Sequence, residues 1–234
     1  NIMEQLSCKN CGTIYTETFC NHCGQKTPHR YTIAHVFHEL VHTVTHADKG
    51  IFSFAWNIIR KPGAIALDFV EGRRKRHFNI FQYLLIIVSI TTFLISKTDF
   101  MESSMNSMNS LAGTKMSSRQ AAFQLEIVTF LQKYFNILQL SLVPVYAFFT
   151  WIFLGKKKFN YAENIVLLSS VTAQTNTIAV FTTLFAFFIT TASGVLIYTI
   201  ISFVIILFGF AIAFKQFYKI SAGKAILYAV LIYG

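Results

Sequence analysis

FNIFQYLLIIVSITTFLIS, residues 78–96, decides the fold class of this chain. The run contains no charged side chain, and a helix needs roughly 20 such residues to cross about 30 Å of hydrocarbon. Three further apolar runs follow at about 134–154, 165–190 and 195–214. A fifth begins at Ala225, and its ten residues up to Gly234 would reach only about 15 Å. Residues 78–234 are therefore predicted to form a transmembrane domain, an all-α bundle of four or more membrane-spanning helices.

The composition agrees with a membrane protein. Of the 234 residues, 54% are hydrophobic and 13% are charged, whereas soluble domains carry about 25% charged residues. The formal net charge of +10 would suit a nucleic-acid-binding protein. Here, however, the basic residues gather at the borders of the apolar runs, where orientation in a bilayer explains them. The distribution of the basic residues therefore argues against a nucleic-acid partner.

The basic residues also predict the direction in which the helices cross. Ten Lys and Arg precede the first apolar run, whereas the 97–133 loop has four. Two later clusters, at 156–158 and 215–224, mark further basic loops. Because Lys and Arg are concentrated on the cytoplasmic side, we expect a multi-pass protein with its N-terminus in the cytoplasm and the 97–133 loop outside. Residues 101–118, rich in Ser, Met and Asn, are predicted to be a linker.

Four cysteines precede the membrane domain in two CxxC pairs, Cys8 with Cys11 and Cys20 with Cys23, each followed directly by glycine. Four thiolates at this spacing can close a tetrahedral zinc site, and glycine permits the tight turn of each pair. Two disulfides are the alternative, but a cytoplasmic location disfavours them. Residues 1–28 are therefore predicted to form a zinc ribbon. Its Zn²⁺ would be structural, because four sulfurs leave no coordination position open.

Residues 29–77 are predicted to be amphipathic juxtamembrane helices, and the first of them, over 32–47, is rich in histidine. His35, His38, His42 and His46 share the face opposite its apolar stripe, together with Glu39. The segment 38–42 is a literal HExxH, in which two histidines can bind one zinc and the glutamate can act as general base. Candidates for a third ligand are His35, His46, Asp48, Asp68, Glu71 and His77.

Three interpretations of this histidine face remain open. It can be a catalytic metallopeptidase centre formed by His38, Glu39 and His42, or a non-catalytic second metal site of His35, His38, His42 and His46. It can also be a set of polar side chains at the lipid headgroups or against another subunit.

The rest of the juxtamembrane region holds two shorter helical stretches, 50–59 and 64–72, separated by the helix-breaking Arg60-Lys61-Pro62-Gly63. The basic run Arg73 to Arg76 follows, where anionic lipid headgroups are expected.

The third apolar run is unusually polar, with seven Ser, Thr, Gln and Asn between 169 and 177. Such groups commonly hydrogen-bond between helices, and a polar cavity for a substrate or ions is the alternative. At its start, Asn160 is expected to cap the helix while Glu163 faces the positive end of the helix dipole as a solvated charge. The alternative is a polar functional group at the cytoplasmic mouth of the bundle. The four runs contain no Asp, Glu, Lys, Arg or His, which argues against a proton-coupled transporter.

Three segments in order resemble one known family: CKNCGTIYTETFCNHCGQK (8–26), YTIAHVFHELVHTVTHADKGIFSFAWNIIRKPG (31–63) and DFVEGRRKRHFNIFQYLL (68–85). It is a family of bacterial polytopic membrane proteins of unknown function, with an N-terminal zinc ribbon before a His-rich helix. The resemblance covers residues 8–96 and is looser beyond them, where NYAEN (160–164) stands in place of a similar polar motif. It implies a location in the bacterial cytoplasmic (inner) membrane and supplies no reaction.

The sequence favours a non-enzymatic membrane subunit or adaptor, whose ribbon and juxtamembrane helices engage a protein partner or a second copy of the chain. A membrane-associated zinc metallopeptidase using the HExxH is the first alternative. A transporter or channel component, based on the polar third run, is the second.

Overall fold

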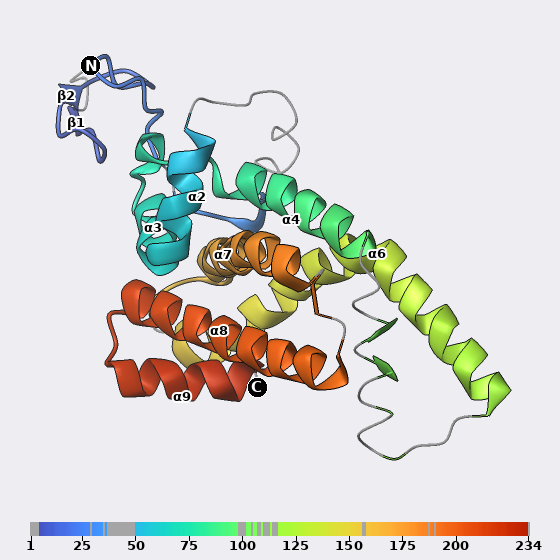
Figure 1. Ribbon diagram of the computed structural model, residues 1–234. Coiled ribbons are helices and arrows are strands. Elements are labelled where there is room, and N and C mark those ends of the chain that lie inside the picture. The colour runs from blue at the N-terminus through green and yellow to red at the C-terminus, as the bar shows by residue number, and fades with distance from the viewer. Residues whose placement is uncertain are drawn as a thin grey trace.

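The computed structural model describes residues 5–28, 30–34, 36, 50–97, 117–155, 158–186, 188–189 and 191–233, and six positions between 102 and 113. Most of this part of the chain is helical, and two short strands, β1 (Leu6–Ser7) and β2 (Ile14–Tyr15), lie near the N-terminus. Four helices are long and apolar enough to cross a membrane. The predicted helical membrane fold is confirmed, and Figure 1 shows the small N-terminal unit at one end of the bundle.

The membrane-spanning helices lie close to their predicted positions. They are α4 (Ile80–Ser96), α6 (Ser118–Thr150), α7 (Tyr161–Ala186) and α8 (Ala192–Tyr218), with α6 continuing as a π-helical turn, η2 (Trp151–Gly155). The fifth apolar run forms the shorter helix α9 (Ala222–Tyr233), which folds back along α8 (Figure 1).

Helix α6 begins much earlier than expected, because residues 118–133 are helical and not part of a loop. Ser117 and Gln120 form a capping box, in which the Gln120 side chain accepts a hydrogen bond from the Ser117 backbone N–H at 2.8 Å. The residues that follow are rich in Ala, Gln and Leu, which favour helix. They are too polar to be recognised as part of a span, so hydropathy alone placed them in the loop.

Helix α7 lies at the centre of the bundle. It contacts α4, α6 and α8 as well as the two short helices α2 (Ile51–Arg60) and α3 (Pro62–Val70). Its polar residues are therefore buried between helices, and Ser170, Gln174 and Asn176 are each no more than 2% exposed.

The break between α2 and α3 lies at Lys61, as predicted, and Pro62 begins α3. Proline suits the first position of a helix, because the N–H that it lacks has no partner there anyway. Both short helices were predicted to be amphipathic juxtamembrane helices. Instead, α3 is buried against α7 and α8, because PGAIALDFV is apolar on nearly every side. We call the end of the bundle where α7 begins and α8 ends the ribbon end, because the N-terminal unit contacts it.

Candidate metal centre and its contacts with the bundle

The N-terminal unit is built from two similar turns around the cysteine pairs. In each turn the glycine after the second cysteine donates its N–H to the carbonyl of the first, from Gly12 to Cys8 at 2.9 Å and from Gly24 to Cys20 at 2.8 Å. Gly12 and Gly24 have φ values of 78° and 68°, which side chains with a Cβ rarely adopt. On either side of the first turn, β1 and β2 pair in antiparallel register. The predicted glycine turns are confirmed.

The turns bring all four Sγ atoms within 4.8 Å of one another. The Cys8 and Cys23 sulfurs are 3.6 Å apart, as are those of Cys11 and Cys20. Four thiolates around one Zn²⁺ with Zn–S bonds of about 2.3 Å would be about 3.8 Å apart, whereas disulfide sulfurs are about 2.05 Å apart. The four cysteines are therefore positioned to bind a metal ion and are not paired as disulfides.

The surroundings of the sulfurs differ within the site. Burial raises the pKa of Cys8 to about 11, whereas hydrogen bonding with the side chain and backbone of Thr13 lowers the pKa of Cys11 to about 5. The pKa of Cys23 is also lowered, by the backbone N–H of Gln25. Part of the site thus favours the thiolate form that binds metal. His22 is exposed and is not among the residues that the structure brings together here.

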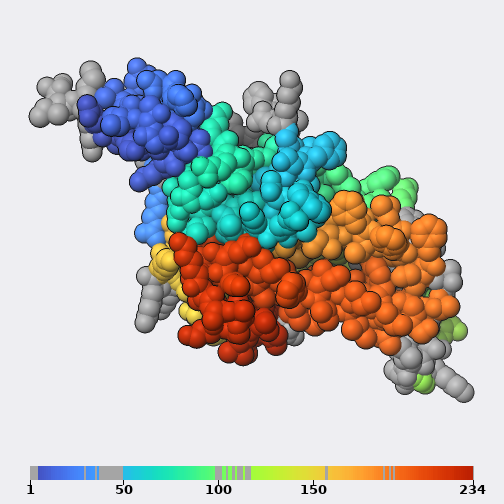
Figure 2. Space-filling model, turned by 60° about the vertical axis from the view of Figure 1, so that its left-hand side comes forward, coloured from blue at the N-terminus to red at the C-terminus, as the bar shows by residue number. Residues whose placement is uncertain are grey.

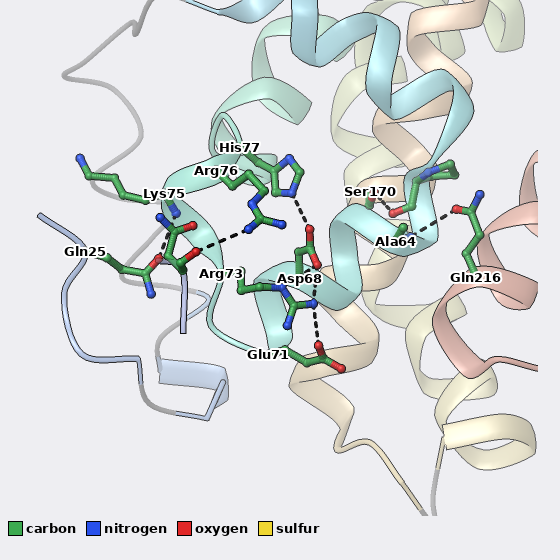
Figure 3. A network of polar contacts seen from close by, with 12 residues as sticks. Gln25, Ala64, Asp68, Glu71, Arg73, Lys75, Arg76, His77, Ser170 and Gln216 are labelled. Atoms are coloured by element: carbon green, nitrogen blue, oxygen red, sulfur yellow. Dashed lines mark hydrogen bonds and ion pairs between the residues drawn. The ribbon is translucent and has the colours of Figure 1, made fainter. Parts of the chain in front are cut away.

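The ribbon is attached to the chain just before α4 through Gln25, which follows Cys23 by two residues. The Gln25 side chain is buried, donates to the carbonyl of Gly72, and accepts from the N–H of Lys75 at 3.3 Å (Figure 3). Gly72 has a φ of 89°, and a Cβ there would lie 2.6 Å from Pro28. This turn therefore requires glycine for its backbone conformation and for its contact with the ribbon.

Asp68, at the end of α3, organises the basic run that follows. Its carboxylate accepts from Arg73 Nε at 2.9 Å and contacts Nε2 of His77 at 2.8 Å, while Arg73 also pairs with Glu71 at 2.6 Å (Figure 3). Partial burial would raise the pKa of Asp68, but the hydrogen bonds from His77 and Arg73 outweigh burial and hold the pKa below its usual value. Asp68, Glu71 and His77, considered above as metal ligands, thus form one network of ion pairs and hydrogen bonds with Arg73.

Two of the four cations in the predicted lipid-binding run are directed at the protein. Arg73 pairs with Asp68, and the Arg74 guanidinium lies 4.0 Å from the centre of the Tyr31 ring. Lys75 and Arg76 are exposed, with one long contact of 3.5 Å from Arg76 to the carbonyl of Asn10.

A second attachment joins the residues after the ribbon to the start of α7. Glu163, whose side chain is 4% exposed, accepts from Nε and Nη2 of Arg30 at 2.8 and 3.1 Å. Glu163 and Asn160 also cap the helix reciprocally, each accepting from the other's backbone N–H, at 2.7 and 2.8 Å. The predicted Asn160 cap is confirmed. The predicted solvated charge is wrong, because Arg30, distant in sequence, covers the Glu163 carboxylate.

The break between α2 and α3 leaves backbone groups without helical partners, and side chains of α7 and α8 bind them. Gln174 donates to the carbonyl of Ile59, at the end of α2, at 2.8 Å. Ser170 adds a hydrogen bond at 2.8 Å to the carbonyl of Pro62, the first residue of α3. From α8, Gln216 donates to the Arg60 carbonyl at 3.1 Å and accepts from two consecutive N–H groups of α3, at 3.1 and 3.2 Å (Figure 3).

These bonds explain much of the polarity of the third span. The helix break is buried between α7 and α8, where unsatisfied peptide groups would cost several kcal/mol each. Side-chain donors and acceptors replace the missing helical bonds. Farther along α7, Thr177 bonds to the hydroxyl of Tyr83 at 2.8 Å, and the Asn176 carbonyl accepts from Thr91 at 3.3 Å.

The histidine face lies outside the described residues: His35, His38, Glu39, His42, His46 and Asp48. Within the described ranges, the four cysteines are the one group of His, Cys, Asp or Glu close enough together to hold a metal.

Sequence reasoning did not find Gln25, Arg30 or Gln216. Gln216 gave a faint signal, as a lone amide at the end of a strongly apolar run. The other two act on residues more than 45 positions away, so only the fold reveals their partners.

Comparison with known proteins gives one result. Residues 48–92 match a family described as "Protein of unknown function (DUF3667)". The matched segment contains all of α2 and α3 with the break between them, the Asp68 cluster and most of α4, and it does not reach the cysteines. No curated protein and no solved structure matches the chain. The segment that matches the family of unknown function is thus the one that Gln25 of the ribbon and Gln174 of α7 contact.

Proposed function

We propose that this chain is a non-enzymatic subunit or adaptor of the bacterial cytoplasmic membrane, with a zinc ribbon that engages a protein partner on the cytoplasmic side. The ribbon would be an independent unit of residues 1–28, joined through juxtamembrane residues 29–77 to the membrane domain 78–234. Zinc is the metal that best suits four cysteines in two CxxC turns.

The position of the ribbon supports this proposal most directly. Gln25 and Arg30 attach one side of the N-terminal region to the turn at Gly72 and to α7. Away from these contacts, Ile14 and Phe19 are 63% and 53% exposed. Both side chains are therefore accessible to a partner protein.

Site-specific photo-crosslinking in cells tests the adaptor proposal. A photoreactive residue in place of Phe19 should give a discrete cross-linked protein, identified by mass spectrometry. The same residue in place of Ser193, exposed where α8 begins, should not. Cys20→Ser should abolish the product, because the ribbon loses its metal. A product that persists in Cys20→Ser, or none at Phe19, would contradict an adaptor role for the ribbon.

The cytoplasmic placement is testable on its own. The Arg30–Glu163 contact puts the ribbon region and the start of α7 at one end of the bundle, and we propose that this end faces the cytoplasm. A membrane-impermeant maleimide should label Ser193→Cys in intact cells and Ser221→Cys only after permeabilisation. The reverse pattern would overturn the topology.

The metallopeptidase remains the first alternative, based on the HExxH of His38, Glu39 and His42. Its test is proteolysis by the purified chain, compared with Glu39→Gln at equal metal content. The transporter or channel alternative has one observation in its favour, a cavity of about 210 Å³ among α4, α6, α7 and α8. Thr182, Tyr198 and Ser202 bring hydroxyl groups to its mostly apolar wall.

A further inference from the structure

The helix break exposes two cations beside aromatic side chains. Arg60 and Lys61 are both exposed, although the backbone around them is bound to α7 and α8. Phe52, Trp56 and Arg60 follow one another at intervals of four along α2, so they share a face. Phe52 and Trp56 are 88% and 58% exposed, and the Arg60 guanidinium lies 4.6 Å from the Trp56 ring. This face combines the features of an interfacial helix, aromatic toward the acyl chains and basic toward the headgroups.

Helix α8 adds two more cations at the same place. Gln216 bonds to the Arg60 carbonyl, and its neighbours Lys215 and Lys219 are both exposed. Figure 2 shows α2 and α3 meeting the hairpin of α8 and α9 along one face of the molecule. The four exposed basic side chains Arg60, Lys61, Lys215 and Lys219 therefore belong to the segments that meet at the helix break, and we call them the break cluster.

No acidic side chain balances the break cluster within the described residues. The ion pairs found there join Glu163 to Arg30, and Asp68 and Glu71 to Arg73, with Asp68 also contacting His77. The acids nearest in sequence to the break are therefore already used by other cations. Four exposed cations without a counter-charge attract anions, and the exposed aromatic face places them at a lipid surface.

We propose that the break cluster binds the phosphate headgroup of an anionic phospholipid, with Phe52 and Trp56 among the acyl chains. The site differs from the Arg73–Arg76 run, in which Arg73 and Arg74 are directed at protein groups. A lipid phosphate at the break would bind cations of both α2 and α8 on the surface of the bundle. It would thus connect the same two helices that the hydrogen bond from Gln216 to the Arg60 carbonyl connects.

The two tryptophans of the chain, Trp56 and Trp151, allow a direct test. In the full chain carrying Trp151→Phe, Trp56 is the single reporter. It is titrated in neutral detergent micelles with phosphatidylglycerol carrying brominated acyl chains, which quench tryptophan on contact, and in parallel with brominated phosphatidylcholine. Each basic residue near an anionic surface contributes about fivefold in affinity, so phosphatidylglycerol should quench at concentrations at least tenfold lower.

Paired charge removals locate the site. Arg60→Gln/Lys61→Gln and Lys215→Gln/Lys219→Gln should each remove most of the preference for phosphatidylglycerol, while thermal unfolding in phosphatidylcholine stays unchanged. Lys97→Gln/Lys133→Gln is the matched control, because these lysines also lie over aromatic rings, at 5.6 and 5.3 Å. Lys97 directly follows α4 and Lys133 belongs to α6. The control should retain the preference.

Three results would overturn the proposal. Equal quenching by both lipids would show that no anionic headgroup is selected. Loss of the preference in Lys75→Gln/Arg76→Gln, with retention in both break-cluster variants, would assign the headgroup to the predicted basic run. Displacement of phosphatidylglycerol by millimolar inorganic phosphate would identify the ligand as a soluble anion.

Discussion

Gly63→Ala tests whether the helix break is held against α8 as the structure shows. A Cβ at position 63 would lie 2.1 Å from the carbonyl oxygen of Ala213 and 2.9 Å from Cβ of Gln216. Ordinary contact begins near 3.4 Å, so the start of α3 would have to move away by about 1.3 Å (3.4 − 2.1). The obstacle is backbone of a long helix, which cannot turn aside as a flexible side chain can.

The size of the effect follows from the bonds at this contact. A displacement of this size breaks the two hydrogen bonds from α3 to Gln216, now 3.1 and 3.2 Å long, and each contributes about 1 kcal/mol. Crowding in a packed core costs a further 1–3 kcal/mol or so. Alanine in place of glycine in a helix returns up to about 1 kcal/mol. We therefore expect Gly63→Ala to lower the free energy of unfolding by about 2–4 kcal/mol.

Thermal unfolding in detergent micelles, followed by fluorescence of Trp56 and Trp151, measures this loss. For a chain of this size about 1 kcal/mol corresponds to roughly 2–4 °C, so the midpoint should fall by about 5–15 °C. Gly223→Ala is the control, because nothing lies within 4 Å of the Cβ that it adds, and its midpoint should stay equal or rise. A Gly63→Ala midpoint within 2 °C or so of the unmodified chain would refute the close contact of α3 with α8.

Three further predictions concern contacts at the ribbon end. Arg30→Ala should lower the free energy of unfolding by about 2 kcal/mol, because it leaves the buried Glu163 carboxylate without its cation; in a cycle with Glu163→Gln the two losses should not add, and strict additivity would contradict the pair. Asp68→Asn should lower the unfolding midpoint at pH 7, and the difference should shrink as the pH falls below about 3.9, because a carboxylate with a depressed pKa stabilises the fold only while ionised; a difference independent of pH would count against its bonds to Arg73 and His77. Gln25→Ala should retain metal and increase hydrogen exchange at the Lys75 N–H, and unchanged exchange there would show that the ribbon is not attached through Gln25.

Hydropathy and cysteine spacing predicted the features that depend on residues near in sequence. The membrane-spanning runs were found because a helix in lipid must be apolar over a fixed length. The glycine turns of the ribbon were found because each is complete within five residues, from Cys8 to Gly12 and from Cys20 to Gly24.

The features that were missed depend on tertiary contacts. The charge of Glu163 was expected in solvent, because its partner Arg30 lies 133 residues away and no local sequence pattern joins the two. The polar residues of α7 were recognised as a cluster for which packing between helices was favoured and a cavity was the alternative, but the pattern could not name their partners. Only the position of the α2–α3 break shows that Ser170 and Gln174 bind its carbonyls.

The central claim is that the four cysteines hold one zinc ion in a ribbon fixed to the membrane bundle. Metal analysis of the purified full chain, combined with X-ray absorption at the zinc edge, tests it most directly. We expect one zinc per chain with four sulfur neighbours at about 2.3 Å, and loss of that zinc in Cys8→Ser/Cys20→Ser. A chain without stoichiometric zinc, or zinc with nitrogen or oxygen neighbours that survives Cys8→Ser/Cys20→Ser, would contradict it.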